Sequence, residues 1–292
     1  MLTHASSNDP QWLDAMYNNR ARVPDHGINL ARWAEASALA RQASGFTGDI
    51  VYGEGAGEKL DVFRATASAV TSKRGAPVLV FIHGGYWRSL DKADHSFVAP
   101  AFTAEGVCVV VPNYDLCPAV TIPEITMQMV RALAWTWRHI AEFGGDPGRI
   151  TVAGHSAGGH LAAMLLACDW PAFAADLPPT LVRNALSISG LHDLAPLAGA
   201  PSMKDVLRLT PETVKRASPA WFPRPARGVL NAAVGGDESE EFLRQNRLIQ
   251  QAWGGRTVPV CEALPGLNHF SILDDLVTPG RRLHQITSAL LA

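Results

Sequence analysis

The sequence is poor in cysteine and lacks long hydrophobic runs. Only 4 of its 292 residues are cysteine, and their spacing matches neither a disulfide framework nor a zinc cluster. We therefore expect Cys108, Cys117, Cys168 and Cys261 to be reduced thiols, as is usual in the cytoplasm. No apolar run approaches the roughly 18 residues that a transmembrane helix needs, so we expect no membrane segment.

An excess of charge of one sign is also missing. The 25 Lys and Arg residues stand against 27 Asp and Glu residues, and the net charge is -2. No basic stripe is visible, so nucleic acid is not an expected partner. The first residues, MLTHASSNDPQW, contain neither the basic nor the apolar region of a secretory signal. These observations together favour a cytoplasmic protein.

Sequence patterns that bind metals or dinucleotides are likewise missing. The histidines and acidic residues show no HExxH or similar ligand spacing, so we expect no metal. The stretch YGEGAGEK contains the glycines of a loose G-x-G pattern, but it precedes the parallel strands instead of following the first of them. We therefore expect no cofactor.

What the chain does contain is an alternation of short apolar runs and helical segments. Residues 1–50 include two helical patterns, DPQWLDAMYNN and GINLARWAEASALARQ, which predict an N-terminal helical cap. Residues 51–292 alternate apolar strands with helices, a pattern typical of a mostly parallel sheet covered by helices on both faces. The prediction is a single α/β domain over residues 1–292, with a Pro-rich excursion around 195–227 as a candidate lid.

Ligands of such sheets bind at the carboxyl ends of the strands. Seven strands are expected, within the runs KLDVFRA, APVLVFIHGG, GVCVVVPNY, RITVAGHS, VRNALSISG, GVLNAAVGG and TVPVCEALPG. The residues that follow each run are therefore the first place to look for chemistry.

A serine between glycines follows the fourth of these strands. The stretch GHSAG fits the G-x-S-x-G pattern, in which a serine stands on a sharp turn between a strand and a helix. Ser156 is therefore the candidate nucleophile, with Gly154 and Gly158 leaving room around it. FIHGGYW, after an earlier strand, fits an oxyanion loop, whose backbone N–H groups would act together with that of Ala157.

A serine nucleophile needs a base, and in this pattern the order along the chain is serine, acid, histidine. Only His269 and His284 follow the last predicted strand. His284 lies in the C-terminal helix among polar residues, so we expect it to face solvent, and His269 is the candidate base. The acid is expected in GGDESEEF, where Asp237 and Glu238 both qualify and the residues alone do not separate them.

Other histidines and several aromatic residues lie close to these motifs. We expect His155 and His160 to fix the turn or pack beneath it, and His83 and His192 to orient loops. The candidate lining of an apolar pocket comprises Trp12, Tyr17, Tyr86 and Trp87.

Several motifs together make the chain resemble a known family. Four of them occur in the order HGGYW, GHSAGGHLA, SGLHDL and NHFSIL, and the N-terminal stretch MYNNRARVPDH adds a fifth. The chain is similar to the arylformamidase (kynurenine formamidase) branch of the α/β-hydrolases, near the hormone-sensitive-lipase-like esterases. The resemblance implies the α/β-hydrolase fold and an oxyanion hole formed by Gly84, Gly85 and Ala157, with the Tyr86 N–H as a further candidate.

The resemblance also implies a catalytic triad. Ser156 and His269 match the family motifs, and the family acid lies in a pattern like ESEEF, which favours Glu238 over Asp237. His192 stands in SGLHDL where the family often has tyrosine. The resemblance therefore makes His192 a candidate pocket residue, in addition to the aromatic ones.

The predicted function is that of a serine hydrolase which cleaves a small amide or ester through an acyl-enzyme. Arylformamides of the N-formylkynurenine type are the first expectation, and esters with short acyl chains are the alternative. A remote third hypothesis is a hydrolase fold that only binds a small ligand, although such proteins usually lose the nucleophile or the base. The expected partner is a small-molecule substrate, and the C-terminal helix and Pro-rich excursion are candidate surfaces for a homodimer.

Overall fold

The computed structural model describes residues 8–70 and 72–292. Residues 1–7, the start of the predicted N-terminal cap, and residue 71 lie outside the described part. The chain forms one eight-stranded sheet with the strand order β1-β2-β4-β3-β5-β6-β7-β8. Its strands are β1 (Phe46–Val51), β2 (Lys59–Phe63), β3 (Ala76–Ile82), β4 (Cys108–Pro112), β5 (Gly145–His155), β6 (Asn184–Ile188), β7 (Val229–Gly235) and β8 (Cys261–Leu264).

The sheet is parallel from β4 to β8, and β2 joins it antiparallel to β4. The expectation that residues up to 50 are helical is wrong at its end, because Phe46–Val51 form the edge strand β1, antiparallel to β2. The rings of Phe46 and Phe63 face each other across this pair at 5.0 Å. The predicted architecture, a mostly parallel sheet with helices on both faces, is confirmed.

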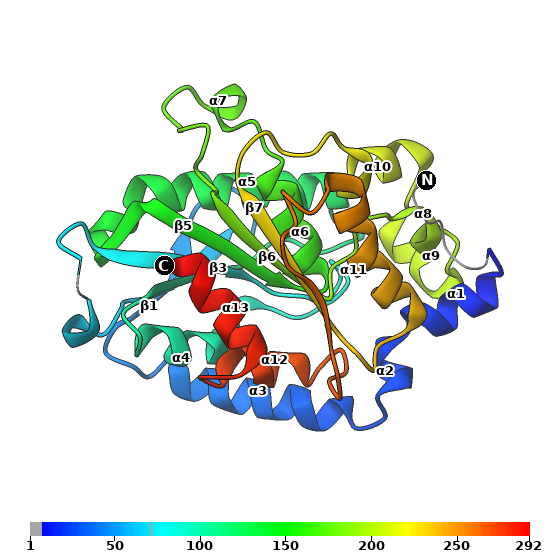
Figure 1. The fold of residues 1–292 in the computed structure, drawn as a ribbon, viewed down its shortest axis with the longest axis horizontal. Helices are drawn as coiled ribbons and strands as arrows, with labels where there is room; N and C mark the ends of the chain where they lie inside the picture. Colours follow the sequence, from blue (N-terminus) through cyan, green and yellow to red (C-terminus); the bar gives the residue numbers. More distant parts are fainter. Residues whose placement is uncertain (1–7, 71) are drawn as a thin grey trace.

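Helices cover both faces of the sheet (Figure 1). The helices are α1 (Pro10–Tyr17), α2 (Asn19–Arg22), α3 (His26–Ala40), α4 (Ala99–Thr103), α5 (Ile122–His139), α6 (Ala157–Leu166), α7 (Trp170–Phe173), α8 (Ala195–Ala198), α9 (Pro201–Leu207), α10 (Pro211–Arg216), α11 (Glu240–Trp253), α12 (Ile272–Val277) and α13 (Arg282–Leu291). Short 3₁₀ turns are η1 (Ala67–Ala69), η2 (Lys92–Asp94), η3 (Ser96–Val98), η4 (Ile140–Phe143) and η5 (Pro219–Trp221).

The central strands alternate their side chains between two buried cores. In β3, Val78, Val80 and Ile82 face one core, and Leu79 and Phe81 face the other, as expected from the two-residue period of a strand. Helices α5, α6 and α11 close the first core, whereas α3, α4, α12 and α13 close the second (Figure 1). Burial on both faces explains why these strands read as continuous apolar runs.

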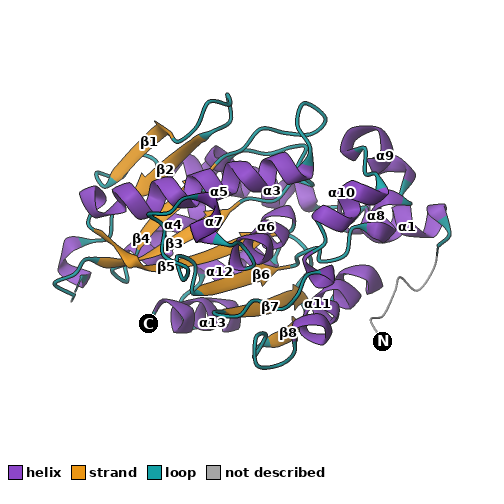
Figure 2. Cartoon of the chain, turned by 90° about the horizontal axis from the view of Figure 1, so that it is seen from above, coloured by secondary structure: helices purple, strands orange, loops and turns teal. Residues whose placement is uncertain are grey.

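The N-terminal helices and the Pro-rich excursion meet at one end of the sheet. Helix α1 contacts α8, α9 and α11, and Figure 2 shows α1, α8 and α9 gathered there. Asp9 caps α1 by accepting a hydrogen bond from the N–H of Gln11, and Pro10 occupies its first turn, as the Asp-Pro start predicts. The excursion is therefore helical, and it packs against the N-terminal segment.

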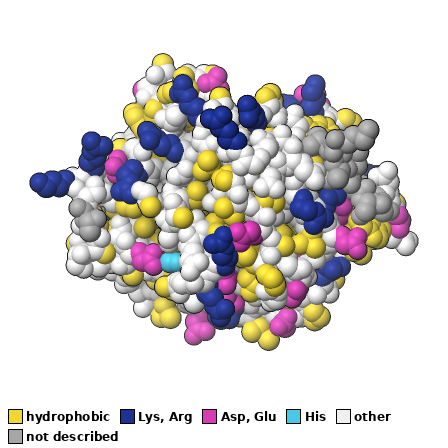
Figure 3. Space-filling model, viewed as in Figure 1, with side chains coloured by type: hydrophobic (Ala, Val, Ile, Leu, Met, Phe, Trp, Pro, Cys, Tyr) yellow, Lys and Arg dark blue, Asp and Glu magenta, His cyan; other side chains and the backbone are white. Residues whose placement is uncertain are grey.

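Basic and acidic side chains are spread over the face of the molecule seen in Figure 3, with more of the basic ones in its upper half. Within the described residues, no helix has both the length and the apolar character needed to cross a membrane. The four cysteines, Cys108, Cys117, Cys168 and Cys261, are free thiols.

Candidate active site

The turn at Ser156 connects β5 to α6. Ser156 has φ 56° and ψ -117°, a conformation that non-glycine residues rarely adopt and that often marks functional sites. Its N–H donates to the carbonyl oxygen of Ile188 at 2.8 Å. A methyl group added at Gly158 would lie 2.0 Å from the carbonyl oxygen of Ile82, and one at Gly154 would lie 2.1 Å from that of Gly158. The turn therefore requires both glycines.

The loop after β3 lies directly against this turn. A methyl group added at Gly84 would lie 3.1 Å from the Cβ of Ser156. Gly85 and Tyr86 follow with φ of 106° and 53°, and both line the same cavity as Ser156. Ala157 is the first residue of α6, and N–H groups in the first turn of a helix have no intrahelical acceptor. The structure thus brings the predicted oxyanion donors to the serine.

His269 and Glu238 come from the loops that follow β8 and β7. Nδ1 of His269 lies 2.6 Å from Oε2 of Glu238. The other carboxylate oxygen accepts hydrogen bonds from the Ser189 hydroxyl at 2.5 Å and from the Gly235 N–H at 2.8 Å. Asp237 is exposed, and its N–H donates to the carbonyl oxygen of Leu267. Of the two acids left open by the sequence, the structure brings Glu238 to the imidazole.

Further histidines support these loops. Nε2 of His155 donates to the carbonyl oxygen of His269 at 2.8 Å, and the two rings lie 4.7 Å apart. Burial lowers the pKa of His155 well below its usual range, so this ring is neutral near pH 7. His83 bonds to the carbonyl oxygen of Gly84 at 2.8 Å. His160 packs beneath the turn and bonds to the carbonyl oxygen of Ala217 at 2.7 Å.

Ser156 and His269 open into one cavity of about 260 Å³. Its walls come from the N-terminal helices, the loop after β3, helix α9 and the loop after β8. The lining residues are Tyr17, Asn18, Asn19, Arg20, Leu30, Trp33, Gly85, Tyr86, Arg88, Ser89, Leu90, His155, Ser156, Ser202, Met203, His269 and Phe270. The predicted pocket residues Tyr17 and Tyr86 are among them, and the tyrosine hydroxyl of Tyr86 donates to the carbonyl oxygen of Tyr17 at 2.6 Å.

Three predicted pocket residues do not line this cavity. Trp87 is 0% exposed and stacks edge-on against His160 in the core, because the backbone turns at Trp87, with φ 56°, and directs the indole beneath the loop. Trp12 packs against the same core. His192 is buried within 3.3 Å of the Ser187 hydroxyl, and burial lowers its pKa to about 3.

The prediction that His284 faces solvent is wrong. Its ring is buried and stacks on Phe102 at 5.0 Å. Leu283 and Thr287, its neighbours on α13, are buried as well. Helix α13 thus turns a face with both polar and apolar residues toward the second core. The polar neighbours of His284 in the sequence therefore did not indicate which face of the helix is exposed.

Sequence reasoning missed the apolar walls of the cavity and one polar contact. Leu30, Trp33 and Phe270 line the cavity, and the apolar spacing within GINLARWAEASALARQ was the available signal for the first two. Ser189 was hidden inside the strand run VRNALSISG. Its position directly after β6, at the edge of the sheet where the parallel strands end, was the available signal.

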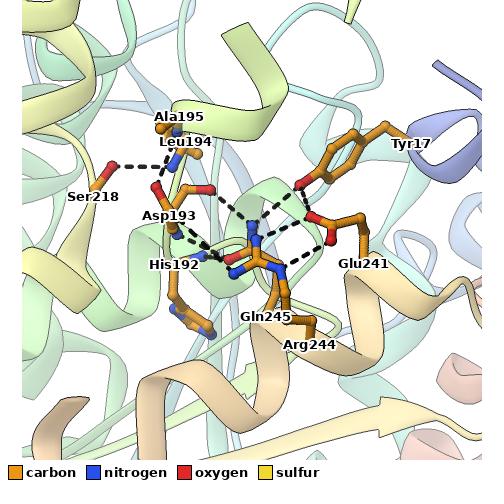
Figure 4. A network of polar contacts seen from close by, with 9 residues as sticks. All are labelled: Tyr17, His192, Asp193, Leu194, Ala195, Ser218, Glu241, Arg244 and Gln245. Carbon is orange, nitrogen blue, oxygen red and sulfur yellow. Dashed lines mark hydrogen bonds and ion pairs between the residues drawn. The ribbon is translucent and has the colours of Figure 1, made fainter. Parts of the chain in front are cut away.

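A buried polar network joins the N-terminal segment to α11 (Figure 4). The Tyr17 hydroxyl donates to Glu241 at 2.7 Å, and Arg244 contacts the same carboxylate at 2.9 Å. Gln245 donates to the carbonyl oxygen of Asp193 and accepts from its N–H. Because α11 begins two residues after Glu238, the network fixes the cavity wall relative to this carboxylate. Over residues 8–70 and 72–292, no group of three metal-ligating side chains is present.

Comparison with known proteins agrees with this architecture. A family model described as the alpha/beta hydrolase fold matches residues 79–269. The kynurenine formamidase of Salmo salar is 31% identical over 247 residues, which cover 82% of this chain and 79% of that protein. A probable carboxylic ester hydrolase of Mycobacterium tuberculosis, LipM, is 37% identical over 159 residues, covering 52% of this chain and 36% of the relative.

Among solved structures, a protein from Silicibacter sp. described provisionally as a thioesterase superimposes with a TM-score of 0.80. It is 31% identical, and the match covers 94% of this chain and 98% of that one. The similarity therefore extends over the N-terminal segment as well as the sheet.

Proposed function

The chain belongs to the α/β-hydrolase family, and on that premise we propose that it is a serine hydrolase which cleaves small amides or esters through an acyl-enzyme. One observation carries the proposal. Ser156, on its strained turn, and His269 line one cavity, and His269 bonds to the buried carboxylate of Glu238. The resemblance to the arylformamidase branch is confirmed by the match to the Salmo salar enzyme.

In the proposed reaction, Oγ of Ser156 attacks the substrate carbonyl carbon while Nε2 of His269 takes the hydroxyl proton. Glu238, bonded to Nδ1, keeps Nε2 free to act as the base and stabilises the imidazolium. The C–N or C–O bond then breaks as His269 gives its proton to the leaving amine or alkoxide. Water attacks the resulting ester by the same route, which releases the acid and restores Ser156.

The negative oxygen of each tetrahedral intermediate needs donors. We assign this role to the backbone N–H groups of Gly84, Gly85 and Ala157, with that of Tyr86 as a further donor. Fixed donors of this kind typically contribute about 10²–10³ in rate each. The close approach of the Gly84 loop to Ser156 supports the assignment.

The cavity favours an aryl substrate with a small acyl group. Trp33 and Phe270 supply aromatic walls, and a volume of about 260 Å³ is near the small end of ligand sites. We therefore propose an arylformamidase-like activity of the N-formylkynurenine type first, in keeping with the Salmo salar relative. Hydrolysis of short-acyl carboxylic esters is the second candidate, and the mycobacterial relative supports it.

The test is a comparison of kcat/KM for N-formylkynurenine, p-nitrophenyl acetate and p-nitrophenyl butyrate, with Ser156→Ala as the blank. A preference for the formamide of about 10²-fold, roughly 2.7 kcal/mol of transition-state discrimination, supports the first activity. Turnover of the esters alone supports the second. Activity that survives in Ser156→Ala contradicts the proposed mechanism.

A cytoplasmic location is the proposed cellular setting. Its support is the set of four free cysteines, a state typical of reducing compartments. Burial raises the pKa of the Cys117 and Cys168 thiols to about 11, which keeps them in the unreactive thiol form at neutral pH.

A further inference from the structure

We propose that the rim of the catalytic cavity is a carboxylate-binding subsite, where Arg20 and Arg88 select aryl substrates that carry a carboxylate away from the scissile bond. The inference rests on the proposed hydrolase function and narrows its substrate class. The two arginines come from distant segments, helix α2 and the loop after β3, yet both line the cavity that holds Ser156.

The charges of these arginines are not neutralised by the protein. Among the described residues, no Asp or Glu lines the cavity and no carboxylate pairs with Arg20 or Arg88. Three of the other exposed arginines, Arg32, Arg138 and Arg282, each contact a carboxylate within 2.8 Å. The catalytic cavity therefore has two guanidinium groups at its opening and no acidic side chain to offset them.

The reacting groups line the buried part of the cavity, and the arginines line its exposed part. Ser156 and His269 are 2% and 6% exposed, whereas Arg20 and Arg88 are exposed. Trp33, in the wall of the same cavity, is buried. A substrate whose carbonyl reaches Ser156 would place its ring against this wall and a remote substituent at the rim. Because a guanidinium matches a carboxylate in geometry and charge, an anionic substituent suits that position.

Asn19 provides a second, independent observation. It lines the cavity and is 6% exposed, and its amide nitrogen is buried without a hydrogen-bond partner within residues 8–70 and 72–292. Buried polar groups are almost always hydrogen-bonded. Because Asn19 and Arg20 line the same cavity, this unsatisfied donor marks the wall beside the arginines as a place for an acceptor from a ligand.

Binding to the Ser156→Ala variant of the full chain tests the subsite without turnover. We would titrate it with 4-phenylbutanoate and with 4-phenylbutanamide, which differ in charge but have similar shape, and follow both by ligand-observed NMR. We expect the carboxylate to bind at least 10-fold tighter than the amide at low salt. Because exposed charges are screened by salt, this preference should shrink at 0.5 M NaCl.

The test variant adds both R20Q and R88Q to Ser156→Ala. The control variant adds Arg227→Gln to Ser156→Ala instead, because Arg227 is an exposed arginine that lines a different cavity. The double substitution should reduce the preference to less than 2-fold, the control should keep it, and R20K with R88K should restore most of it. Melting curves check that each variant is folded.

Equal binding of carboxylate and amide to Ser156→Ala would overturn the subsite. A preference that survives in the R20Q and R88Q variant would overturn it as well. Failure of the proposed function is a different result, namely the absence of turnover of both formamide and esters by the unmodified chain. The two failures are distinguishable because the titration requires no catalysis.

Discussion

At the scale of single residues, the candidate site depends on one carboxylate with three polar neighbours. Glu238 accepts from the Ser189 hydroxyl and the Gly235 N–H through one oxygen and contacts His269 through the other. A buried carboxylate with its oxygens occupied in this way holds one orientation. The imidazole that it contacts is therefore held in one orientation as well.

Replacing this carboxylate should separate the two acids that the sequence left open. Glu238→Gln keeps the shape but removes the charge that stabilises the imidazolium, and we expect kcat to fall by about 10³–10⁴. Asp237→Asn, one residue earlier and exposed, should change kcat by less than about 2-fold. Steady-state kinetics on the preferred substrate measures both. The reverse ranking would reassign the triad acid to Asp237.

Ser189 is a positioning residue in this arrangement, and Ser189→Ala should show it. The substitution removes one donor to the carboxylate, so we expect kcat to fall by about 10-fold, equivalent to about 1.4 kcal/mol, with KM little changed. The free energy of unfolding should fall by about 1–3 kcal/mol, because the hydrogen bond reaches a buried charged group. Unchanged kcat would show that the Gly235 N–H alone is sufficient to hold Glu238.

The residues that the candidate site brings together were predictable because local rules fix their positions. A serine on a turn between a strand and a helix, and a histidine after the last strand, follow from spacing and strand order alone. The direction of a side chain after a turn does not follow. Trp87 was predicted at the pocket, but its backbone at φ 56° directs the ring into the core. Tertiary packing decided that position, and the sequence carries no periodic signal for it.

At the scale of elements, the cavity depends on how the N-terminal helices are fastened to α11. Tyr17, at the end of α1, lines the cavity and bonds to Glu241. Arg244 pairs with the same carboxylate, and both charged groups are buried. The next three residues, Asn18, Asn19 and Arg20, also line the cavity. The network therefore holds this wall of the cavity to the body of the fold.

Breaking this buried pair should destabilise the protein strongly. Glu241→Gln leaves the Arg244 guanidinium with one acidic neighbour fewer in a buried setting, and we expect the free energy of unfolding to fall by about 3 kcal/mol or more. Glu240→Gln, an exposed neighbour on the same helix turn, should change it by less than about 0.5 kcal/mol. Urea unfolding at pH 7 compares the two. Equal effects would mean that the network does not stabilise the fold.

The long central strands could be predicted from the sequence, whereas the edge strand β1 could not. Strands β3 to β7 are buried on both faces and therefore appear as continuous apolar runs. Strand β1 is half-exposed and contains Gly48 and Asp49, so it lacks both the apolar run and a clear alternation. Its strand form depends on pairing with β2, a contact between segments that local pattern does not report.

At the scale of the whole molecule, burial of histidines makes stability depend on pH. Burial lowers the pKa of His83 and His155, and lowers that of His95 and His192 to about 3 and that of His160 to about 4. In the unfolded chain each returns to about 6.5. Below pH 6.5 the unfolded state therefore binds protons that the folded state does not, and folding loses stability as the pH falls.

The size of this loss is testable by urea unfolding between pH 7 and pH 5.5. Below pH 6.5 each such histidine is worth about 1.4 kcal/mol per pH unit. Over the single unit from pH 6.5 to pH 5.5, His95, His160 and His192 together should therefore remove about 4 kcal/mol. Carboxylates with lowered pKa, such as Asp176 and Glu262, titrate below this window and do not mask it. His160→Gln should flatten the slope by about one third of that amount, whatever its own effect on stability. A free energy of unfolding that stays constant or rises on acidification would show that these rings take up protons without unfolding.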